Sequence, residues 1–172
     1  MNAKLRFVIF DWGDTLMPEA GPLDIPMADW PEVSCIDGAH ELLAQLSKTY
    51  GIAIATNATV SKHQDVLRAL ERVGLKDFIR EVFWFTELGH KKSETEFWDA
   101  VLTRLGAQRN EVVMIGDSLE QDVLGPMRVG IRAIWFNWKQ EKYSDTASFQ
   151  LVRSLREVPA VIEAIRSGRV KS

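Results

Sequence analysis

The sequence predicts a three-layer α/β sandwich in which helices cover both faces of a doubly wound parallel sheet. Three observations predict this fold class: short apolar runs alternate with segments of helical period, the runs lack the alternation of strands with one exposed face, and polar residues follow where the runs end. The chain has 172 residues, so we expect a single domain over residues 1–172 with a sizeable core.

Five apolar runs are expected to form the strands of the sheet. They are residues 7–10, 52–55, 82–85, 112–115 and 133–136. Short right-handed crossovers in a doubly wound sheet predict the strand order 3-2-1-4-5. Ligands bind such sheets where the strand order reverses, so the residues that follow the first and fourth strands are expected to meet.

Apolar residues recur at helical spacing between these runs. The segments are residues 39–46, 66–73, 97–105 and, at the end of the chain, about 159–166. The third segment is expected to begin at a Ser93 cap with Glu96 as its capping partner, and to end at Gly106.

The composition is that of an ordinary globular protein, with 46% apolar residues, 26% charged residues and a formal charge of −3. This charge argues against nucleic acid or an anionic membrane as a general partner. No apolar run approaches the roughly 20 residues that span a bilayer, and the first run ends at Asp11, unlike a signal peptide. We therefore expect a cytoplasmic protein.

Four groups of polar residues lie at the predicted strand ends or before the third helix. They are Asp11 with Asp14, Thr56 with Asn57, the lysine pair Lys91-Lys92, and Asp117 with Asp122. A carboxylate can act as a nucleophile in phosphoryl transfer, and carboxylate oxygens are the ligands that Mg²⁺ prefers. Each residue alone also has a plain structural explanation, such as a strand-end acid that caps a turn.

Taken together and in this order, the four groups resemble the motifs of the haloacid dehalogenase (HAD) superfamily, and the resemblance covers nearly the whole chain. The resemblance implies a Rossmann-like core and a magnesium-dependent phosphohydrolase that acts through an aspartyl-phosphate on Asp11. Its substrate would be a phosphomonoester or an activated phosphate, carried by a small molecule or a phosphoprotein.

The resemblance also assigns roles to individual residues. Mg²⁺ would be held by Asp11, Asp117 and the main-chain carbonyl of Gly13, with Asp122 in support. Thr56, Asn57 and Lys91 would bind the phosphoryl group, and Trp12 would lie at the mouth of the site. Lys91 is preferred because it precedes the aromatic Phe97 by six residues, as in the family, whereas Lys92 stands where the family usually has proline and is expected to be a solvated surface charge.

The sequence departs from the family pattern at Gly13. Relatives usually carry an aspartate there, which protonates the leaving group and then activates water, whereas this chain has Asp14 one residue later. Asp14 could be a displaced acid–base group, or it could cap the turn. Two alternatives follow: a catalytically weak phosphate- or metal-binding protein of this fold, and a phosphonatase-like hydrolase of carbon–phosphorus bonds.

Relatives insert a cap domain after the first or second motif, and neither gap is long enough for one here. A proline-rich loop, residues 18–36 with Met27 and Trp30, would lie near the site in place of a cap. The resulting open site is compatible with a homo-oligomer in which a partner covers it. The sequence does not name the substrate.

Overall fold

A computed structural model describes residues 4–143 and 149–169 of the chain. The strands are β1 Phe7–Phe10, β2 Gly51–Thr56, β3 Ile79–Trp84, β4 Val112–Gly116, β5 Arg132–Phe136 and β6 Gln150–Val152. The α-helices are α1 Ala39–Leu46, α2 His63–Arg72, α3 Phe85–Leu88, α4 Thr95–Leu105, α5 Gly125–Arg128 and α6 Val158–Arg166. The π-helix η4 covers Leu119–Leu124, and short 3₁₀ turns are η1 Met27–Asp29, η2 Lys76–Phe78, η3 Arg109–Glu111 and η5 Leu155–Glu157.

The strands form one parallel sheet in the order β3-β2-β1-β4-β5-β6. The expected order 3-2-1-4-5 is therefore confirmed, and β1 lies between β2 and β4 in the middle of the sheet. Phe10, the last residue of β1, is aligned with Ile54 of β2 and with Ile115 of β4. This register brings the ends of the three central strands to one edge.

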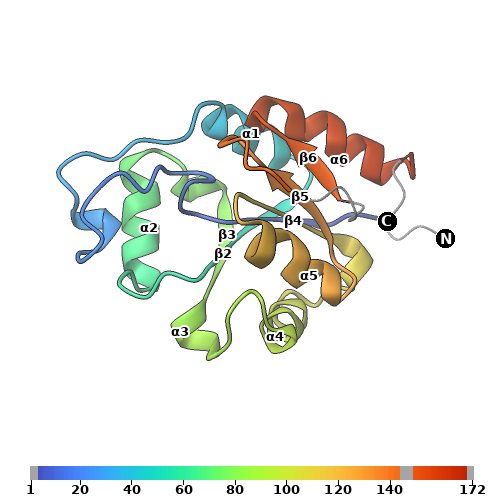
Figure 1. The fold of residues 1–172 in the computed structure, drawn as a ribbon, viewed down its shortest axis with the longest axis horizontal. Coiled ribbons are helices and arrows are strands. Elements are labelled where there is room, and N and C mark those ends of the chain that lie inside the picture. Colours follow the sequence, from blue (N-terminus) through green and yellow to red (C-terminus); the bar gives the residue numbers. More distant parts are fainter. Residues whose placement is uncertain (1–3, 144–148, 170–172) are drawn as a thin grey trace.

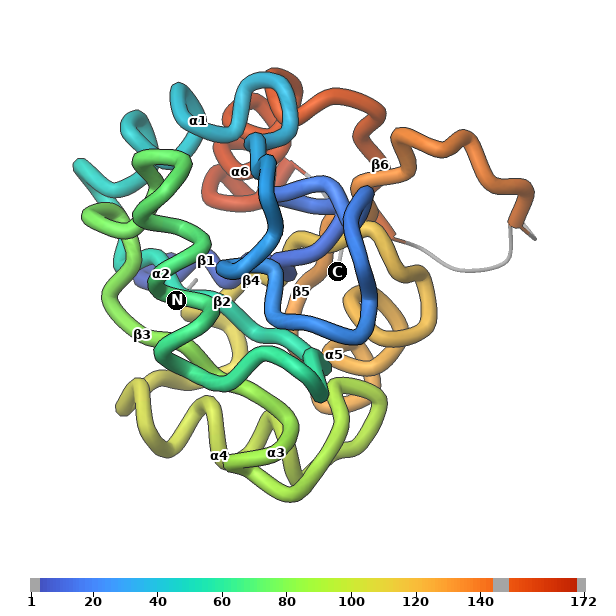
Figure 2. Tube along the Cα trace, turned by 90° about the vertical axis from the view of Figure 1, so that its left-hand side faces the viewer, coloured from blue at the N-terminus to red at the C-terminus, as the bar shows by residue number. Residues whose placement is uncertain are grey.

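Helices cover both faces of the sheet, which confirms the three-layer architecture. Helices α1, α2 and α6 pack on one face and α4 on the other, together with η4. Figure 2 shows α1 and α6 on one side of the strands and α3 and α4 on the opposite side. Apolar side chains of β1 alternate between the two layers, with Val8 and Phe10 in one cluster and Ile9 in the other. The central strands are consequently buried on both faces, and they read as unbroken apolar runs.

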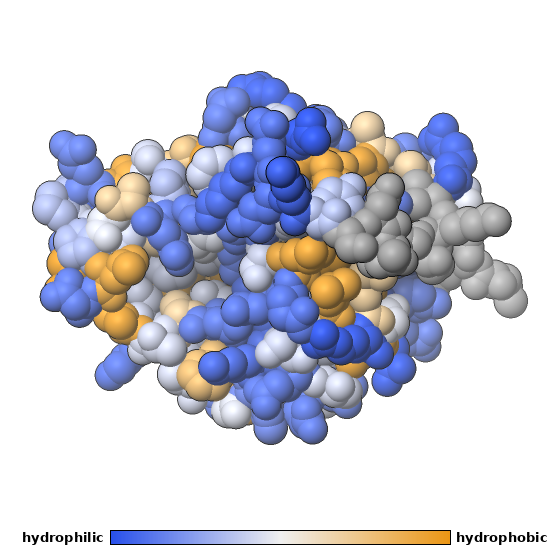
Figure 3. Space-filling model, in the orientation of Figure 1, coloured by the Kyte–Doolittle hydropathy of each residue, from blue (hydrophilic) through white to orange (hydrophobic). Residues whose placement is uncertain are grey.

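The face of the molecule seen in Figure 3 is mostly hydrophilic, and hydrophobic residues gather in separate patches on it. Over the part of the chain that the structure describes, no helix is long and apolar enough to cross a membrane.

Two details differ from the sequence-based expectations. A sixth strand, β6, extends the sheet beside β5, and it was missed because it has three residues and begins with the polar Gln150. Helix α4 begins at Thr95 with Glu94 at the N-cap, rather than at a Ser93 cap. The second difference alters which lysine reaches the site.

Candidate active site

A cavity of about 400 Å³ opens where β1, β2 and β4 end. Its lining is strongly charged. The charged side chains that line it are five carboxylates and two lysines: Asp11, Asp14, Glu19, Asp117, Asp122, Lys92 and Lys139.

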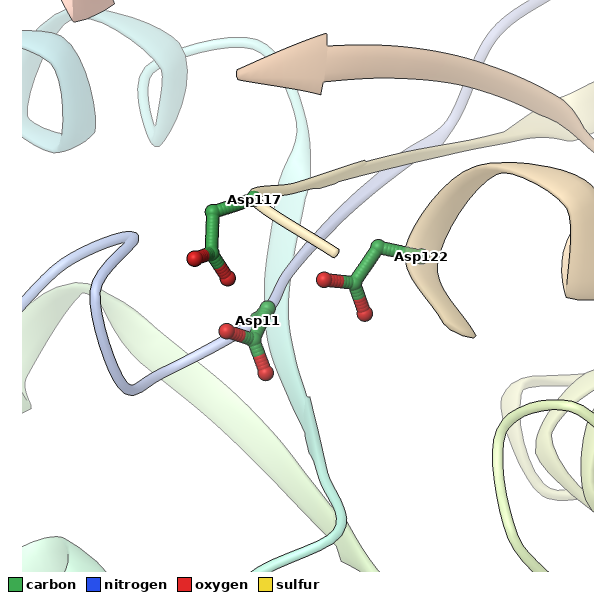
Figure 4. Close-up of side chains that lie close together, drawn as sticks. All are labelled: Asp11, Asp117 and Asp122. Atoms are coloured by element: carbon green, nitrogen blue, oxygen red, sulfur yellow. The ribbon is translucent and has the colours of Figure 1, made fainter. Parts of the chain in front are cut away.

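Three of the carboxylates converge from different elements. Asp11 follows β1, Asp117 follows β4 and Asp122 lies on η4, and Figure 4 shows their side chains grouped together. One carboxylate oxygen from each lies within 4.8 Å of the others. The end of β1 is fixed because the Asp11 N–H donates to the carbonyl of Ile115 at 2.9 Å. The expected meeting of the first and fourth strand ends is thus confirmed.

Lys92 is buried beside two of these carboxylates, Asp11 and Asp122, with 2% of its surface exposed. Its Nζ lies 2.5 Å from Asp11 Oδ1 and 2.7 Å from Asp122 Oδ1. Burial by itself would lower the pKa of Lys92, but the charges of Asp11 and Asp122 outweigh it and raise the pKa. Lys92 is therefore held as an ammonium ion beside Asp11.

The backbone of Lys92 is anchored as firmly as its side chain. Its N–H donates to Asn57 Oδ1 at 3.1 Å, and its carbonyl accepts the indole N–H of Trp98 at 2.6 Å. A Cβ on Gly125 would approach the same carbonyl within 2.3 Å, so glycine is required there for close packing.

Lys91 does not reach the cavity, contrary to the sequence-based expectation. It is exposed, and its Nζ lies 5.7 Å from the centre of the Phe85 ring. The interpretation of Lys92 as a solvated surface charge was wrong. The difference arises because α4 begins later than expected. Lys91 lies in the turn closed by Glu94, whose carboxylate accepts the Lys91 N–H, and Lys92 is the residue that points inward.

Asp122 supports the site from underneath. It is fully buried, and its Oδ2 accepts the N–H of Ser118 at 3.0 Å while Oδ1 faces Lys92. Oδ2 is therefore hydrogen-bonded, whereas Oδ1 makes no hydrogen bond within the described part of the chain and is matched there by the charge of Lys92 alone. A Cβ on Gly116 would clash with the Asp122 carboxyl at 2.3 Å, so the strand end lies directly against this side chain.

Thr15 links the two sides of the aspartate group, and sequence reasoning did not single it out. Its buried hydroxyl donates to Asp11 Oδ2 and accepts the N–H of Asp117, each at 3.1 Å. The signal was present in the sequence as a hydroxyl residue between Asp14 and the apolar Leu16. Thr15 fixes the rotamer of Asp11 and the position of Asp117 together.

Thr56 and Asn57 both line the cavity. Thr56 Oγ1 accepts the N–H of Ala58 at 3.1 Å, which leaves its own proton available to a ligand. Asn57 donates from Nδ2 to Gln121 at 2.5 Å and accepts from Lys92, so both ends of its amide hold neighbouring residues.

Trp12 touches the cavity but is 3% exposed, and its indole N–H points to the sulfur of Met17 at 3.2 Å. It packs in the core and forms part of the cavity lining, with its side chain buried rather than exposed. In the proline-rich loop, Met27 and Trp30 are also buried, whereas Leu23 and Ile25 are exposed where the loop lines the cavity.

Asp14 terminates a tight turn. Its φ of 54° is left-handed, which aspartate tolerates better than most residues, and its Oδ1 accepts the N–H of Glu19 at 2.9 Å. Its Oδ2 lies 2.7 Å from Lys139 Nζ, and Lys139 also contacts Asp117 at 3.1 Å. Sequence reasoning missed Lys139, which comes three residues after the end of β5.

Glu19 carries the remaining carboxylate, and sequence reasoning missed it as well. An ideal Cβ on Gly13 would lie 2.0 Å from Glu19 Oε1, so this carboxylate rests on the glycine. Glu19 is exposed as a whole residue, but desolvation of its carboxyl group raises the pKa of Glu19, and the charges of Asp11, Asp14 and Asp117 raise it further. Burial and Asp11 likewise raise the pKa of Asp117, against the opposing effect of Lys139. Negative charge is thus in excess on this side of the cavity.

Comparison with known proteins identifies relatives among small-molecule phosphatases. The chain is 35% identical over 111 residues to ribulose-1,5-bisphosphate 5-phosphatase of Halopiger xanaduensis, covering 64% of the chain and 45% of that protein. It is 30% identical over 155 residues to the pyrimidine 5'-nucleotidase YjjG of Escherichia coli, covering 88% of the chain and 68% of that protein. The chain thus spans less than half of the first relative and about two thirds of the second.

A solved structure has the same fold. An uncharacterized protein from Listeria monocytogenes serotype 4b superposes with a TM-score of 0.83 at 27% identity, covering 95% of this chain and 99% of that chain. The family model for haloacid dehalogenase-like hydrolases matches residues 25–136. The chain therefore belongs to the haloacid dehalogenase-like hydrolase family.

Proposed function

We propose that this protein is a magnesium-dependent phosphohydrolase that transfers a phosphoryl group to Asp11 and then to water. The observation that carries the proposal is the pairing of Asp11 with a buried ammonium, Lys92, at the floor of an open cavity. Thr15 contacts one oxygen of Asp11 and Lys92 contacts the other, so the Asp11 carboxylate is fixed in position at the cavity. Lys92 also supplies positive charge for the phosphoryl oxygens.

The donor set fits Mg²⁺. Asp11, Asp117 and the carbonyl of Gly13 would be its ligands, and they are all oxygen donors, which this ion prefers. Asp122 would act mainly through Lys92, because it is fully buried and its Oδ1 faces Lys92 Nζ at 2.7 Å. Bound Mg²⁺ would supply a charge that neutralises the phosphoryl oxygens in the transition state.

The proposed substrate class is a small phosphomonoester. The cavity of about 400 Å³ suits a small ligand, and Thr56 offers a hydroxyl proton to one phosphoryl oxygen. The matched relatives act on a sugar bisphosphate and on pyrimidine nucleotides, which are phosphomonoesters of this size.

A metabolite screen with Mg²⁺ tests this proposal. Purified protein is offered sugar phosphates, nucleoside monophosphates and para-nitrophenyl phosphate, and released phosphate is measured for the wild type and for Asp11→Asn. We expect turnover of at least one substrate that depends on both Mg²⁺ and Asp11. Phosphate or metal binding without turnover would instead support the alternative of a binding protein.

A further inference from the structure

We propose that Glu19 is the proton-transfer residue of this site and takes the place that a side chain at position 13 would fill. This inference deepens the proposed function and depends on it. Hydrolysis of an alkyl phosphate needs a proton for the leaving oxygen and then a base for the attacking water.

Five carboxylates line the cavity, and four of them are paired with a lysine. Asp11 and Asp122 are paired with Lys92, and Asp14 and Asp117 are paired with Lys139. Across residues 4–143 and 149–169, no ion pair or hydrogen bond engages the carboxylate of Glu19. A carboxylate tied to an ammonium is a poor proton donor, so Glu19 is the better candidate on contacts alone.

The side chain of Glu19 lies directly against Gly13. The Cγ, Cδ and Oε1 atoms of Glu19 lie 2.8, 2.6 and 2.0 Å from the position that a residue-13 Cβ would occupy. Gly13 has no left-handed φ, so its backbone does not require glycine. The absence of a side chain at position 13, two residues after Asp11, therefore makes room for the carboxylate of Glu19.

The turn that follows Gly13 brings Glu19 back to the cavity beside that glycine. Asp14 accepts the N–H of Glu19 at 2.9 Å and the N–H of Asp14 donates to the carbonyl of Met17 at 2.7 Å. Lys139 holds the other oxygen of Asp14, and the indole N–H of Trp138 donates to the Asp14 carbonyl at 2.9 Å. Asp14 thus positions Glu19 rather than reacting itself.

The two proton transfers balance as follows. As an oxygen of Asp11 bonds to phosphorus and the ester P–O bond breaks, the Glu19 carboxylic acid gives its proton to the leaving oxygen. In the second step, the Glu19 carboxylate takes a proton from water while the water oxygen bonds to phosphorus. The bond between Asp11 and phosphorus then breaks, which releases inorganic phosphate and restores the protonated Glu19.

The test compares Glu19→Gln with wild type on an alkyl substrate, glycerol phosphate, and an aryl substrate, para-nitrophenyl phosphate. Nitrophenolate leaves without a proton, so its kcat/KM should change less than about three-fold, whereas kcat/KM for glycerol phosphate should fall about 10²–10⁴-fold. Loss of the base should slow the second step for both substrates. The aryl reaction of Glu19→Gln should therefore show a burst of nitrophenolate and accumulate phosphorylated protein, which acid quenching and intact-mass measurement detect.

Three further variants sharpen the test. Glu32→Gln changes an exposed glutamate on the same loop that does not line the cavity, and both substrates should be unaffected. Asp14→Asn keeps an oxygen for the Glu19 N–H, so it should not discriminate between the substrates. Gly13→Asp combined with Glu19→Ala returns a carboxylate to the vacant place and should bring glycerol phosphate hydrolysis back to within about ten-fold of wild type.

The outcomes separate this inference from the proposed function. Three results would overturn the role of Glu19: an equal fall in kcat/KM on both substrates in Glu19→Gln, no fall on either substrate in that variant, or a fall on one substrate only in Asp14→Asn. Each of them would leave Asp11-dependent hydrolysis intact. If the wild-type protein hydrolyses neither of the two substrates nor any metabolite in the screen, the proposed function is overturned, and the role of Glu19 with it.

Discussion

The cavity has two walls that are built by different means. The inner wall consists of Asp11, Lys92 and Asp122, which are buried and paired with one another. The outer wall consists of Asp14, Glu19 and Lys139, which come from loops and are partly or largely open to solvent. The inner wall is placed by the ends of strands and by η4, so its geometry follows from the fold. The outer wall depends on one tight turn and on the segment after β5.

The inner wall therefore fixes the geometry of the site, whereas residues of the outer wall can change more freely. A buried charge without a partner costs several kcal/mol, so each member of the inner wall constrains the other two. Exposed ion pairs contribute about 0–1 kcal/mol, so members of the outer wall can change with little cost to the fold. The departure at Gly13 lies against Glu19 of the outer wall, where a change of side chain costs little.

The largest expected effect is on turnover and comes from the inner wall. Asp11→Asn removes the proposed nucleophile but keeps its size, and Lys92 retains Asp122 as an ionic partner. We expect kcat to fall by roughly 10⁴-fold or more, as with other catalytic nucleophiles, with the melting temperature nearly unchanged. Steady-state hydrolysis of para-nitrophenyl phosphate measures it. Retention of a tenth of the wild-type rate would contradict the role of Asp11.

The largest effect on stability should come from Lys92→Met. This variant leaves Asp11 and Asp122 buried without a cation, which should lower the free energy of unfolding by about 3–5 kcal/mol. Lys91→Met is the matched control, since Lys91 is exposed, and its effect should lie within about 0.5 kcal/mol. Urea denaturation of both variants gives the comparison. Similar losses in the two would show that the inner wall does not depend on Lys92.

Magnesium should stabilise the folded protein to an intermediate degree. The cation would offset the burial and the repulsion by Asp11 that raise the pKa of Asp117, and it would bind the folded state alone. At a free Mg²⁺ concentration ten times Kd, the gain in unfolding free energy should be about 1.4 kcal/mol. Thermal melts with and without Mg²⁺ measure the gain. It should disappear in Asp117→Asn, and an equal gain in that variant would remove Asp117 from the metal site.

The smallest effect is expected from the outer wall. The Lys139 side chain is 38% exposed, so its ion pairs with Asp14 and Asp117 are screened by solvent. Lys139→Met should change the free energy of unfolding by less than about 1 kcal/mol. Urea denaturation in metal-free buffer checks this. A loss comparable to that of Lys92→Met would erase the distinction between the two walls.

Sequence reasoning was strongest where the fold dictates position. The five apolar runs predicted the central strands and their order, and with them the meeting of Asp11 and Asp117. It failed where one residue of register decides which side chain turns inward, as with Lys91 and Lys92 before α4. It also gave no sign of Glu19 or Lys139, because a turn brings them to the site from loops without a periodic pattern.

The proposed mechanism passes the phosphoryl group through Asp11. The most direct measurement is a rapid acid quench of the wild type during hydrolysis of para-nitrophenyl phosphate with Mg²⁺, followed by peptide mass analysis. We predict a phosphorylated peptide that contains Asp11, and its absence in Asp11→Asn. A phosphoryl group on any other residue, or full turnover by Asp11→Asn, would contradict phosphoryl transfer through Asp11.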